Sequence, residues 1–285
     1  MRASFIEISS LVLTFLTAYA LATVTVRSVK PLMAHSGFVA ANFEGRSIPK
    51  GVGIVLPLSA LPPIGVQLWL GGSAALVSLW IAVLCGMGLL GLFDDTAGDR
   101  SHGGFHQHFR ALLAGRATTG AIKALYGGGL GLYAGWALSG GSLLRALVGA
   151  AVIALATNAV NLLDVRPGRA LKGQLLLALA GAVGMLYSVP SPQWHAQHLA
   201  AGTAVAGASM ALWRGDLRGE HMLGDAGSNV LGAAGGMLIA ASALWWQLIW
   251  LAALAWVHVY AERRSLTEVI ERLPWLDRLD RWGRR

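Results

Sequence analysis

The stretch Thr157–Lys172, which reads TNAVNLLDVRPGRALK, joins the end of a long apolar segment to a basic loop. Asn158, Asn161 and Asp164 are spaced three residues apart, so on a helix they share one broad face near the end of that segment. Unpaired amides and carboxylates cost several kcal/mol in hydrocarbon, so a polar face at the mouth of an apolar helix predicts a site for a charged ligand. The structural alternative is that the two asparagines form hydrogen bonds between membrane helices.

The composition of the chain is that of a polytopic membrane protein. Of its 285 residues, 55% are hydrophobic and only 13% are charged, and the mean hydropathy of +0.58 is too high for a soluble domain of this size. The formal net charge of +8 lies in short loops between apolar segments, which is typical of membrane topology, so we do not predict nucleic-acid binding. The single cysteine, Cys85, excludes an intrachain disulfide.

Nine apolar segments are each about long enough to cross a bilayer, which takes roughly 17–25 residues. They are Ser4–Val26, Gly51–Leu70, Ser73–Phe93, Thr119–Leu138, Leu144–Leu163, Gln174–Val189, His198–Trp213, Ser228–Leu244 and Gln247–Tyr260. The sequence therefore predicts an all-α bundle of about nine transmembrane helices over residues 1–261, followed by a cytoplasmic tail over residues 262–285. Three prolines in Gly51–Leu70 indicate that this segment is broken or re-entrant.

The distribution of Lys and Arg between the loops predicts the orientation of the bundle. With the N-terminus outside, nearly all basic residues fall on one side, and the other side receives only Arg2 and Arg145. Cytoplasmic loops carry the excess of positive charge, so the C-terminus is expected in the cytoplasm. The sequence thus predicts a multi-pass protein of the inner cell membrane, with every polar motif on the cytoplasmic side.

Adjacent carboxylates follow the third apolar segment at Asp94 and Asp95. They repel each other, and at a membrane mouth they are tolerated mainly when a cation or a basic partner neutralises them. A solvated turn is the alternative. Lys123 lies one turn inside the next segment, where an ammonium normally has a partner, so we expect it to pair with Asp94, Asp95 or a bound phosphate. Snorkelling of its side chain to the surface is the alternative.

Three histidines, His102, His106 and His108, lie in the loop after the paired aspartates. Their spacing is compatible with zinc, but the loop is rich in glycine and has no cysteine. We therefore favour contact with phosphate or with the surface over a structural zinc site.

The segment from Gly224 to Asn229 places Asp225 between two glycines at the start of the eighth apolar segment. Backbone N–H groups are free at a helix start, and the helix dipole favours anions there. Capping by Asp225 or Ser228 is the structural alternative. Capping does not require the flanking glycines, whereas close approach of a phosphate or a metal does, so Asp225 is a candidate site residue.

The tail differs from the rest of the chain. Ser265 and Glu268 have the spacing of a capping box, and apolar residues recur at helical intervals opposite arginines. The pattern predicts a basic amphipathic helix, bent near Pro274 and lying on the inner leaflet. It either guides an anionic lipid or anchors the chain.

Four motifs together resemble those of the polyprenyl-phosphate N-acetylhexosamine-1-phosphate transferases. This family includes the phospho-N-acetylmuramoyl-pentapeptide transferase of peptidoglycan synthesis and the enzymes that begin teichoic-acid and O-antigen polysaccharides. The resemblance covers most of the chain, and the motifs occur in the family's order. They are Gly45-Arg46-Ser47-Ile48-Pro49, Phe93-Asp94-Asp95, Asn158-Ala159-Val160-Asn161-Leu162-Leu163-Asp164 and Gly224-Asp225-Ala226-Gly227-Ser228.

The resemblance implies that a polyprenyl phosphate attacks the β-phosphorus of a UDP-sugar and releases UMP. It implies a Mg²⁺ cofactor, with Mn²⁺ as an alternative, because Mg²⁺ prefers a few carboxylates and phosphate oxygens. The catalytic residues would be Asp94, Asp95 and Asp225, with Asp225 and Asp95 as metal ligands. The substrate-binding residues would be Arg46, Lys123, Asn158, Asn161 and Asp164. The implied partners are the polyprenyl phosphate lipid, a nucleotide sugar and the membrane, with a homodimer as an option.

The chain departs from the family pattern at several positions. Pro167 replaces the second aspartate of the family's Asp-Gly-x-Asp-Gly sequence, and Asp99 lies one residue later than the usual third aspartate. A histidine-rich loop near the end is absent from the sequence. A relative that binds polyprenyl phosphate or nucleotide without turnover is therefore one alternative. A transporter is another, although its ionisable groups would be expected near mid-membrane rather than at the cytoplasmic ends.

Overall fold

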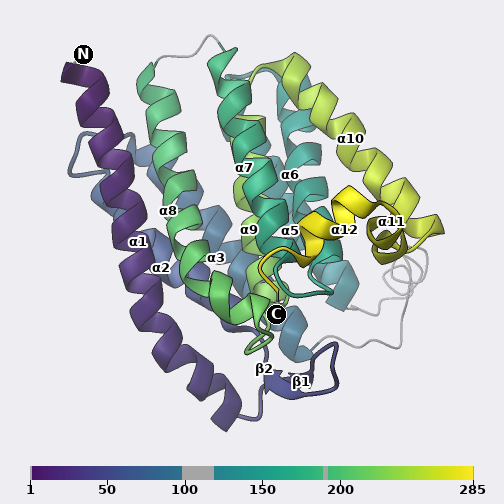
Figure 1. Ribbon diagram of the computed structural model, residues 1–285. Helices are drawn as coiled ribbons and strands as arrows, with labels where there is room; N and C mark the ends of the chain where they lie inside the picture. The colour runs from purple at the N-terminus through teal and green to yellow at the C-terminus, as the bar shows by residue number, and fades with distance from the viewer. Residues whose placement is uncertain (1, 98–118, 189–191, 285) are drawn as a thin grey trace.

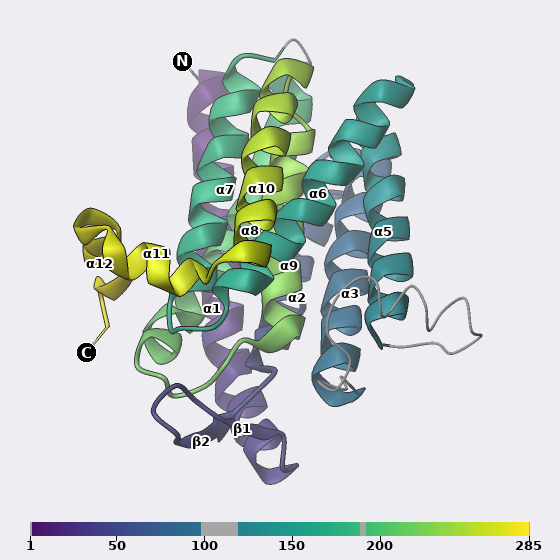
Figure 2. The ribbon, with the colours of Figure 1, turned by 90° about the vertical axis from the view of Figure 1, so that its right-hand side faces the viewer.

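The computed structural model describes residues 2–97, 119–188 and 192–284, and within them the chain is an all-α bundle with one short hairpin. The longer helices run side by side, and the N-terminus lies at the opposite end of the bundle from the hairpin (Figures 1 and 2). The elements are α1 (Arg2–His35), β1 (Val39–Ala41), β2 (Ser47–Pro49), η1 (Val52–Ile54), α2 (Val55–Val66), α3 (Ala74–Ala97), α5 (Thr119–Leu138), α6 (Leu143–Leu163), α7 (Arg169–Leu186), α8 (Pro192–Leu217), α9 (Gly224–Ala240), α10 (Leu244–Arg263), α11 (Leu266–Arg272) and α12 (Pro274–Arg281).

Five helices of the described ranges are long and apolar enough to cross a membrane. They are Ile8–His35 within α1, and α3, α6, α7 and α10. The predicted all-α class is confirmed, and each of the nine predicted apolar segments contains a helix. The count of nine spans and their orientation stay predictions. The segment with three prolines forms the short helical stretch Val52–Val66, which at 1.5 Å per residue is only about 23 Å long.

Helix α9 occupies the centre of the bundle and packs against α3, α6 and α7. Almost every residue along it is buried. Two glycines let its backbone lie directly against α6. A Cβ at Gly232 would lie 2.5 Å from the Cα of Thr157, and one at Gly236 would lie 2.8 Å from the Cα of Ile153. Helix packing at this distance requires small residues and holds the start of α9 in a fixed place.

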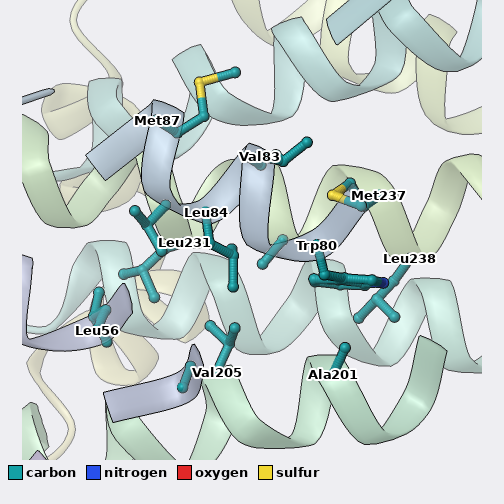
Figure 3. Packing of buried hydrophobic residues seen from close by; sticks show 14 of the residues in the cluster. Leu56, Trp80, Val83, Leu84, Met87, Ala201, Val205, Leu231, Met237 and Leu238 are labelled. Atoms are coloured by element: carbon teal, nitrogen blue, oxygen red, sulfur yellow. The ribbon is translucent and has the colours of Figure 1, made fainter. Parts of the chain in front are cut away.

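The apolar core lies where α2, α3, α8 and α9 meet (Figure 3). Trp80 and Leu84 of α3 are fully buried there with Leu56 of α2 and with Leu231 and Met237 of α9. Between membrane helices, where lipid rather than water is the alternative environment, such side chains stabilise the contact mainly by close van der Waals packing. The core therefore fixes α3 against α9, the two helices that carry the paired aspartates and Asp225.

The hairpin is tied to the loop that precedes α9. The amide of Met222 donates to the carbonyl of Pro49 at 2.8 Å, and the amide of Val52 donates back to Met222 at 3.1 Å. The amide of Gly53 donates to the carbonyl of Leu223 at 3.0 Å. These three backbone bonds set the position at which α9 begins and bring the residue after β2, Lys50, next to it.

The tail forms α11 and α12, which are separated at Pro274 as predicted. In Figure 2 they project sideways from the lower end of α10. The tail also binds the body of the protein, which the sequence did not predict. Asp280 is buried and accepts hydrogen bonds from the guanidinium of Arg169 at 2.9 and 2.8 Å. Lys172 donates to three tail carbonyls, including that of Trp282 at 2.9 Å.

The carboxylate of Asp280 is the centre of this contact. Burial opposes its ionisation, but the hydrogen bonds and positive charge of Arg169, together with the charge of Arg284, lower the pKa of Asp280 below its ordinary value. Arg284 also donates to the carbonyl of Pro167 at 2.7 Å. The tail thus contacts Pro167, the position at which the resembled family has its second aspartate.

Candidate active site at the lower end of the bundle

Lys123 links two of the predicted aspartates. Its ammonium donates to Asp94 of α3 at 3.2 Å and also forms a short ion pair with Asp225 of α9. All three side chains are partly buried, with 22–28% of each exposed. Lys123 has the acidic partner that the sequence predicted, and its side chain does not merely extend to the surface. The two aspartates therefore share one cation.

Two glycines bring α3 and α9 close enough for this arrangement. A Cβ at Gly91 would lie 2.1 Å from the carbonyl oxygen of Asp225, so the two backbones are in direct contact. Gly224 has a φ of 69°, and a Cβ there would lie 2.5 Å from a carboxylate oxygen of Asp95. Close approach at Gly224 is thus required, as predicted, but the group that approaches is a carboxylate of the protein itself.

Asp95 caps helix α9 across the bundle. Its Oδ2 accepts a hydrogen bond from the amide of Ala226 at 3.0 Å, and its Oδ1 pairs with the ammonium of Lys50 at 2.9 Å. The side chain is only 1% exposed. The structural alternative for Asp225, capping by its own side chain or by Ser228, is therefore not what is observed: a carboxylate from α3 satisfies a free N–H and complements the helix dipole. Asp95 is therefore engaged with Ala226 and Lys50, and the two aspartates that share the ammonium of Lys123 are Asp94 and Asp225.

Lys50 was not among the predicted site residues. The sequence signal that could have pointed to it is its position directly after the Gly-x-x-x-Pro loop, next to Gly51. Its partner lies 45 residues further along the chain, however, so the pairing depends on how the hairpin packs on α9.

Helix α6 contributes Asn161 to the same cluster. The amide of Asn161 donates to the side chain of Asn229 at 3.3 Å and also forms a hydrogen bond with Asp225. It therefore bridges α6 and α9, which was the structural alternative, while still contacting a candidate site residue. Asn158, one turn earlier on α6, is exposed to solvent and is not brought to the carboxylates.

Asp164 follows the end of α6 and lies among other acidic groups. Burial, reinforced by the negative charges of Asp216, Asp225 and Asp95, raises the pKa of Asp164 well above its ordinary value, although a backbone hydrogen bond with Gly224 opposes this shift. Asp164 is therefore part of the electrostatic environment of the paired aspartates and Asp225, as the sequence predicted from its position.

A small cavity of about 50 Å³ lies beside Asp164, between the hairpin and the loop before α9. Asp216 lines it, three residues beyond the predicted seventh segment, and burial raises its pKa to about 6 even though the amide of Gly168 donates to it at 2.6 Å. His221 also lines the cavity, and burial lowers its pKa to about 4. Neither ring nitrogen of His221 has a hydrogen-bond partner within the described residues. The cavity thus contains buried polar groups available to a ligand.

Arg46 does not reach the carboxylates. It lies in the turn between β1 and β2, where its side chain is 62% exposed and pairs with Glu44. The turn itself is shaped by Asn42, whose side-chain oxygen accepts hydrogen bonds from the amides of Glu44 and Arg46, each at 2.9 Å. Of the predicted site residues, the structure therefore brings together Asp94, Asp95, Lys123, Asn161, Asp164 and Asp225, and it does not bring Arg46 or Asn158 to them.

No three acidic, histidine or cysteine side chains in the part of the chain that the structure describes are close enough to form a metal site by themselves. The predicted histidines, His102, His106 and His108, and the third aspartate, Asp99, lie outside the described residues.

Comparisons with known proteins add no family assignment. No family model matches the chain, and a search of curated proteins finds no match. The four motifs therefore stand as a resemblance, and the function has to be argued from the chemistry of the site.

Proposed function

We propose that this protein is a membrane transferase that moves a sugar 1-phosphate from a UDP-sugar to a polyprenyl phosphate, giving a polyprenyl-diphosphate sugar and UMP. The observation that carries the proposal is the ion-paired cluster of Asp94, Lys123 and Asp225, which three different helices bring to one end of an apolar bundle. A reaction between two polyanions needs both signs of charge, because phosphates and a divalent cation must be held together. The order of the four motifs supports the same reaction.

The proposed setting is the inner cell membrane, with about nine spans, the N-terminus outside and the C-terminus in the cytoplasm. The distribution of basic residues supports this orientation, since it leaves only Arg2 and Arg145 on the outer side. The cluster then faces the cytoplasm, where nucleotide sugars are made, at the depth where a prenyl chain can stay in the bilayer while its phosphate reaches the site. A homodimer is compatible with this arrangement.

The residues present fit a Mg²⁺ cofactor. Asp94 and Asp225 already share the ammonium of Lys123, so their carboxylates converge on one cation. Mg²⁺ usually takes one or two protein carboxylates and completes its shell with water and phosphate oxygens, so three protein ligands are not required. Asp94 and Asp225 would hold the ion, and its charge would neutralise the phosphates at the reacting phosphorus.

The chain's own residues have distinct tasks in this proposal. Lys123 offsets phosphate charge from inside the bundle, and Asn161 orients Asp225 through its side-chain hydrogen bond. Asp94 is the more exposed of the paired aspartates, and with Asp225 it would hold the ion beside the lipid phosphate, which attacks as its dianion. The phosphate oxygen then bonds to the β-phosphorus of the UDP-sugar, and the bond from that phosphorus to the bridging oxygen breaks, so that UMP leaves with the bridging oxygen.

Asp95 acts as a positioning residue. It touches the amide of Ala226 and the ammonium of Lys50, and through Ala226 it fixes the first turn of α9 and hence Asp225. Its loss should lower kcat through displacement of Asp225, and added Mg²⁺ should recover part of the activity.

The test is release of UMP by the purified protein in lipid nanodiscs that contain undecaprenyl phosphate. The donors are UDP-N-acetylglucosamine and UDP-N-acetylmuramoyl-pentapeptide, each with and without Mg²⁺. We expect Mg²⁺-dependent release that falls about 100-fold in Asp225→Asn. Glu268→Gln, which removes an exposed carboxylate of the tail, is the matched control and should retain the wild-type rate.

A relative that binds without turnover is the second candidate, and the covering of Pro167 by Arg284 favours it. It predicts saturable Mg²⁺-dependent binding of UMP that Asp225→Asn abolishes, with no UMP release from a wider panel of UDP-sugars. A transporter would instead require ionisable groups near mid-membrane, whereas the cluster lies at the helix ends.

A further inference from the structure

A second, larger cleft of about 720 Å³ lies between the hairpin, the loop after α6, the loop before α9 and the two tail helices. Its volume is in the range of sites that hold small molecules. Both signs of charge line it, with arginine the most frequent residue. The lining residues are Phe43, Glu44, Arg46, Arg166, Arg169, Leu217, Arg218, Glu220, Glu271, Asp277, Asp280, Arg281 and Arg284.

Two carboxylates of the cleft are each shared between two basic side chains. Asp280 pairs with both Arg169 and Arg284. Glu220 is held at 2.9 Å by Lys30, and Arg218 lies further from it, at 3.8 Å. The lining contains six arginines and five carboxylates, so the cleft has a small excess of positive charge.

Arg166 has the most available guanidinium of the set. Its guanidinium carbon lies 5.3 Å from the centre of the Phe43 ring, and within the described ranges no carboxylate is at ion-pair distance from it. An arginine stacked on an aromatic ring keeps its N–H edge free, and that edge matches two oxygens of one phosphate. Phe43 itself is about half exposed, so the stacked pair forms part of the open wall.

The same two residues connect the cleft to the candidate active site. Phe43 and Arg166 also line the small cavity that contains Asp164, and Asp164 lies within the electrostatic field of Asp95 and Asp225. The cleft is thus a separate space that adjoins the carboxylate cluster and has the opposite dominant charge.

We propose that this cleft is a binding site for a phosphate-bearing ligand, with Arg166 and Arg46 on the hairpin side as its principal contacts. Guanidinium groups bind phosphate through paired, charge-assisted hydrogen bonds. Arg46 lines the same cleft as Phe43 and Arg166, and a phosphate there would compete with the exposed Glu44 for its guanidinium. The phosphate belongs either to a soluble ligand or to the headgroup of an anionic lipid. The inference rests on the cleft and does not depend on the proposed transferase reaction.

Binding of inorganic pyrophosphate tests the soluble source. The full-length protein is placed in phosphatidylcholine nanodiscs and titrated calorimetrically in a buffer with EDTA, so that no divalent cation can hold pyrophosphate at the aspartates. We expect Arg166→Ala and Arg46→Ala each to weaken binding at least about tenfold, with Arg166→Lys intermediate because it keeps the charge but loses the paired donors. Arg272→Ala, an exposed tail arginine outside the cleft lining, is the matched control and should bind like wild type.

Retention of lipid tests the other source. The protein is reconstituted with equal amounts of phosphatidylglycerol and phosphatidylcholine and is then extracted from the membrane. Native mass spectrometry measures the mass of the protein together with any lipid that stays bound. A phosphatidylglycerol that stays bound to wild type and to Arg272→Ala, but is lost in Arg166→Ala, assigns the cleft to a lipid headgroup. The same pattern with pyrophosphate assigns it to a soluble phosphate.

The proposal is overturned if neither pyrophosphate nor phosphatidylglycerol binds to the wild-type protein. It is also overturned if Arg272→Ala weakens binding of both as much as the cleft variants do. Thermal unfolding of each variant verifies its fold. Arg46→Ala, which removes only an exposed pair with Glu44, keeps the test valid if Arg166→Ala does not fold. The two proposals are tested independently: a cleft that does not bind phosphate does not exclude UMP release, and absence of UMP release does not exclude phosphate binding in the cleft.

Discussion

The carboxylate cluster and the arginine cleft are both built from opposite charges, but the protein holds them in different ways. In the cluster, Asp94 and Asp225 are fixed on helices whose backbones touch at Gly91, and Lys123 reaches both of them from α5. In the cleft, most pairs join long side chains that remain in water, such as Arg281 with Asp277. Exposed pairs are worth about 0–1 kcal/mol, whereas loss of one partner from a buried pair leaves an uncompensated charge. The same kinds of residue should therefore respond very differently to substitution.

The largest expected effect comes from the backbone contact under the cluster. In Gly91→Ala the new methyl group would meet the carbonyl of Asp225 at 2.1 Å, so α3 and α9 must separate. Overpacking of this kind costs about 1–3 kcal/mol or more, and we expect a clear fall in the melting temperature together with loss of any activity. Gly129→Ala on α5 is the control, because its Cβ would meet no atom within 4 Å and should not destabilise the protein. Equal melting temperatures for Gly91→Ala and Gly129→Ala would contradict the direct backbone contact between α3 and α9 at Gly91.

Removal of the shared cation should have the next largest effect. Lys123→Met leaves Asp94 and Asp225 facing each other, and we expect it to lower the free energy of unfolding by about 2 kcal/mol. Mg²⁺ should then stabilise the variant more than wild type, since the two carboxylates can share a divalent ion. Thermal unfolding with Mg²⁺ and with EDTA measures both effects. If the melting temperature of Lys123→Met is the same with Mg²⁺ as with EDTA, the proposal that Asp94 and Asp225 bind the metal is contradicted.

A smaller effect is expected from Asp216, which lies between the two regions. Its pKa is raised to about 6, so the folded state prefers the protonated acid. The resulting stabilisation is complete below the ordinary pKa of about 4 and is lost as the pH rises to about 6. Asp216→Asn, which can still accept the hydrogen bond from Gly168, should therefore be more stable than wild type at pH 7.5, by on the order of 1 kcal/mol, and not at pH 4. A variant whose advantage does not depend on pH would contradict this account.

The smallest effect is expected in the exposed part of the cleft. Arg281→Ala should leave the melting temperature and the docking of the tail unchanged, because the Arg281 side chain that pairs with Asp277 is exposed to water. Arg169→Ala is the contrasting variant: it unpairs buried Asp280 and should release the tail to limited proteolysis. Since the pKa of Asp280 is lowered, the wild-type tail should stay docked down to about pH 4 and be released only as the pH falls through that lowered value. If Arg281→Ala releases the tail as readily as Arg169→Ala does, then exposed and buried ion pairs do not differ in the way proposed here.

The sequence predicted much of the fold and part of the site. Hydrophobic length located the helices, and the cost of polar groups in hydrocarbon predicted that Lys123 needs an acidic partner. The sequence could not predict which aspartate pairs with Lys123 and which one caps α9. Asp95 accepts a hydrogen bond from Ala226 of α9, 131 residues later, and the tail is held by a pair whose members are 111 residues apart. Periodicity shows which face of a helix is buried, but the partner of a side chain depends on packing between distant segments.

The arginine cleft was missed for a related reason. Arg166 and Arg169 lie on either side of Pro167, yet the residues around them in the cleft come from the hairpin and the tail, more than 100 residues away in each direction. Nothing local to the sequence around Pro167 indicates that a tail arginine covers it.

The backbone bonds between the hairpin and the loop before α9 restrict where the chain can gain or lose residues. Met222 and Leu223 are tied to Pro49, Val52 and Gly53, so the first turn of α9 starts from a fixed point. Each residue of an α-helix advances the direction of the next side chain by about 100°. A single residue inserted between Leu223 and Asp225 would therefore turn that carboxylate away from Lys123, whereas the same insertion at the tip of the β1–β2 turn would leave the phase of α9 unchanged. Length variation is accordingly expected at the turn and not before α9.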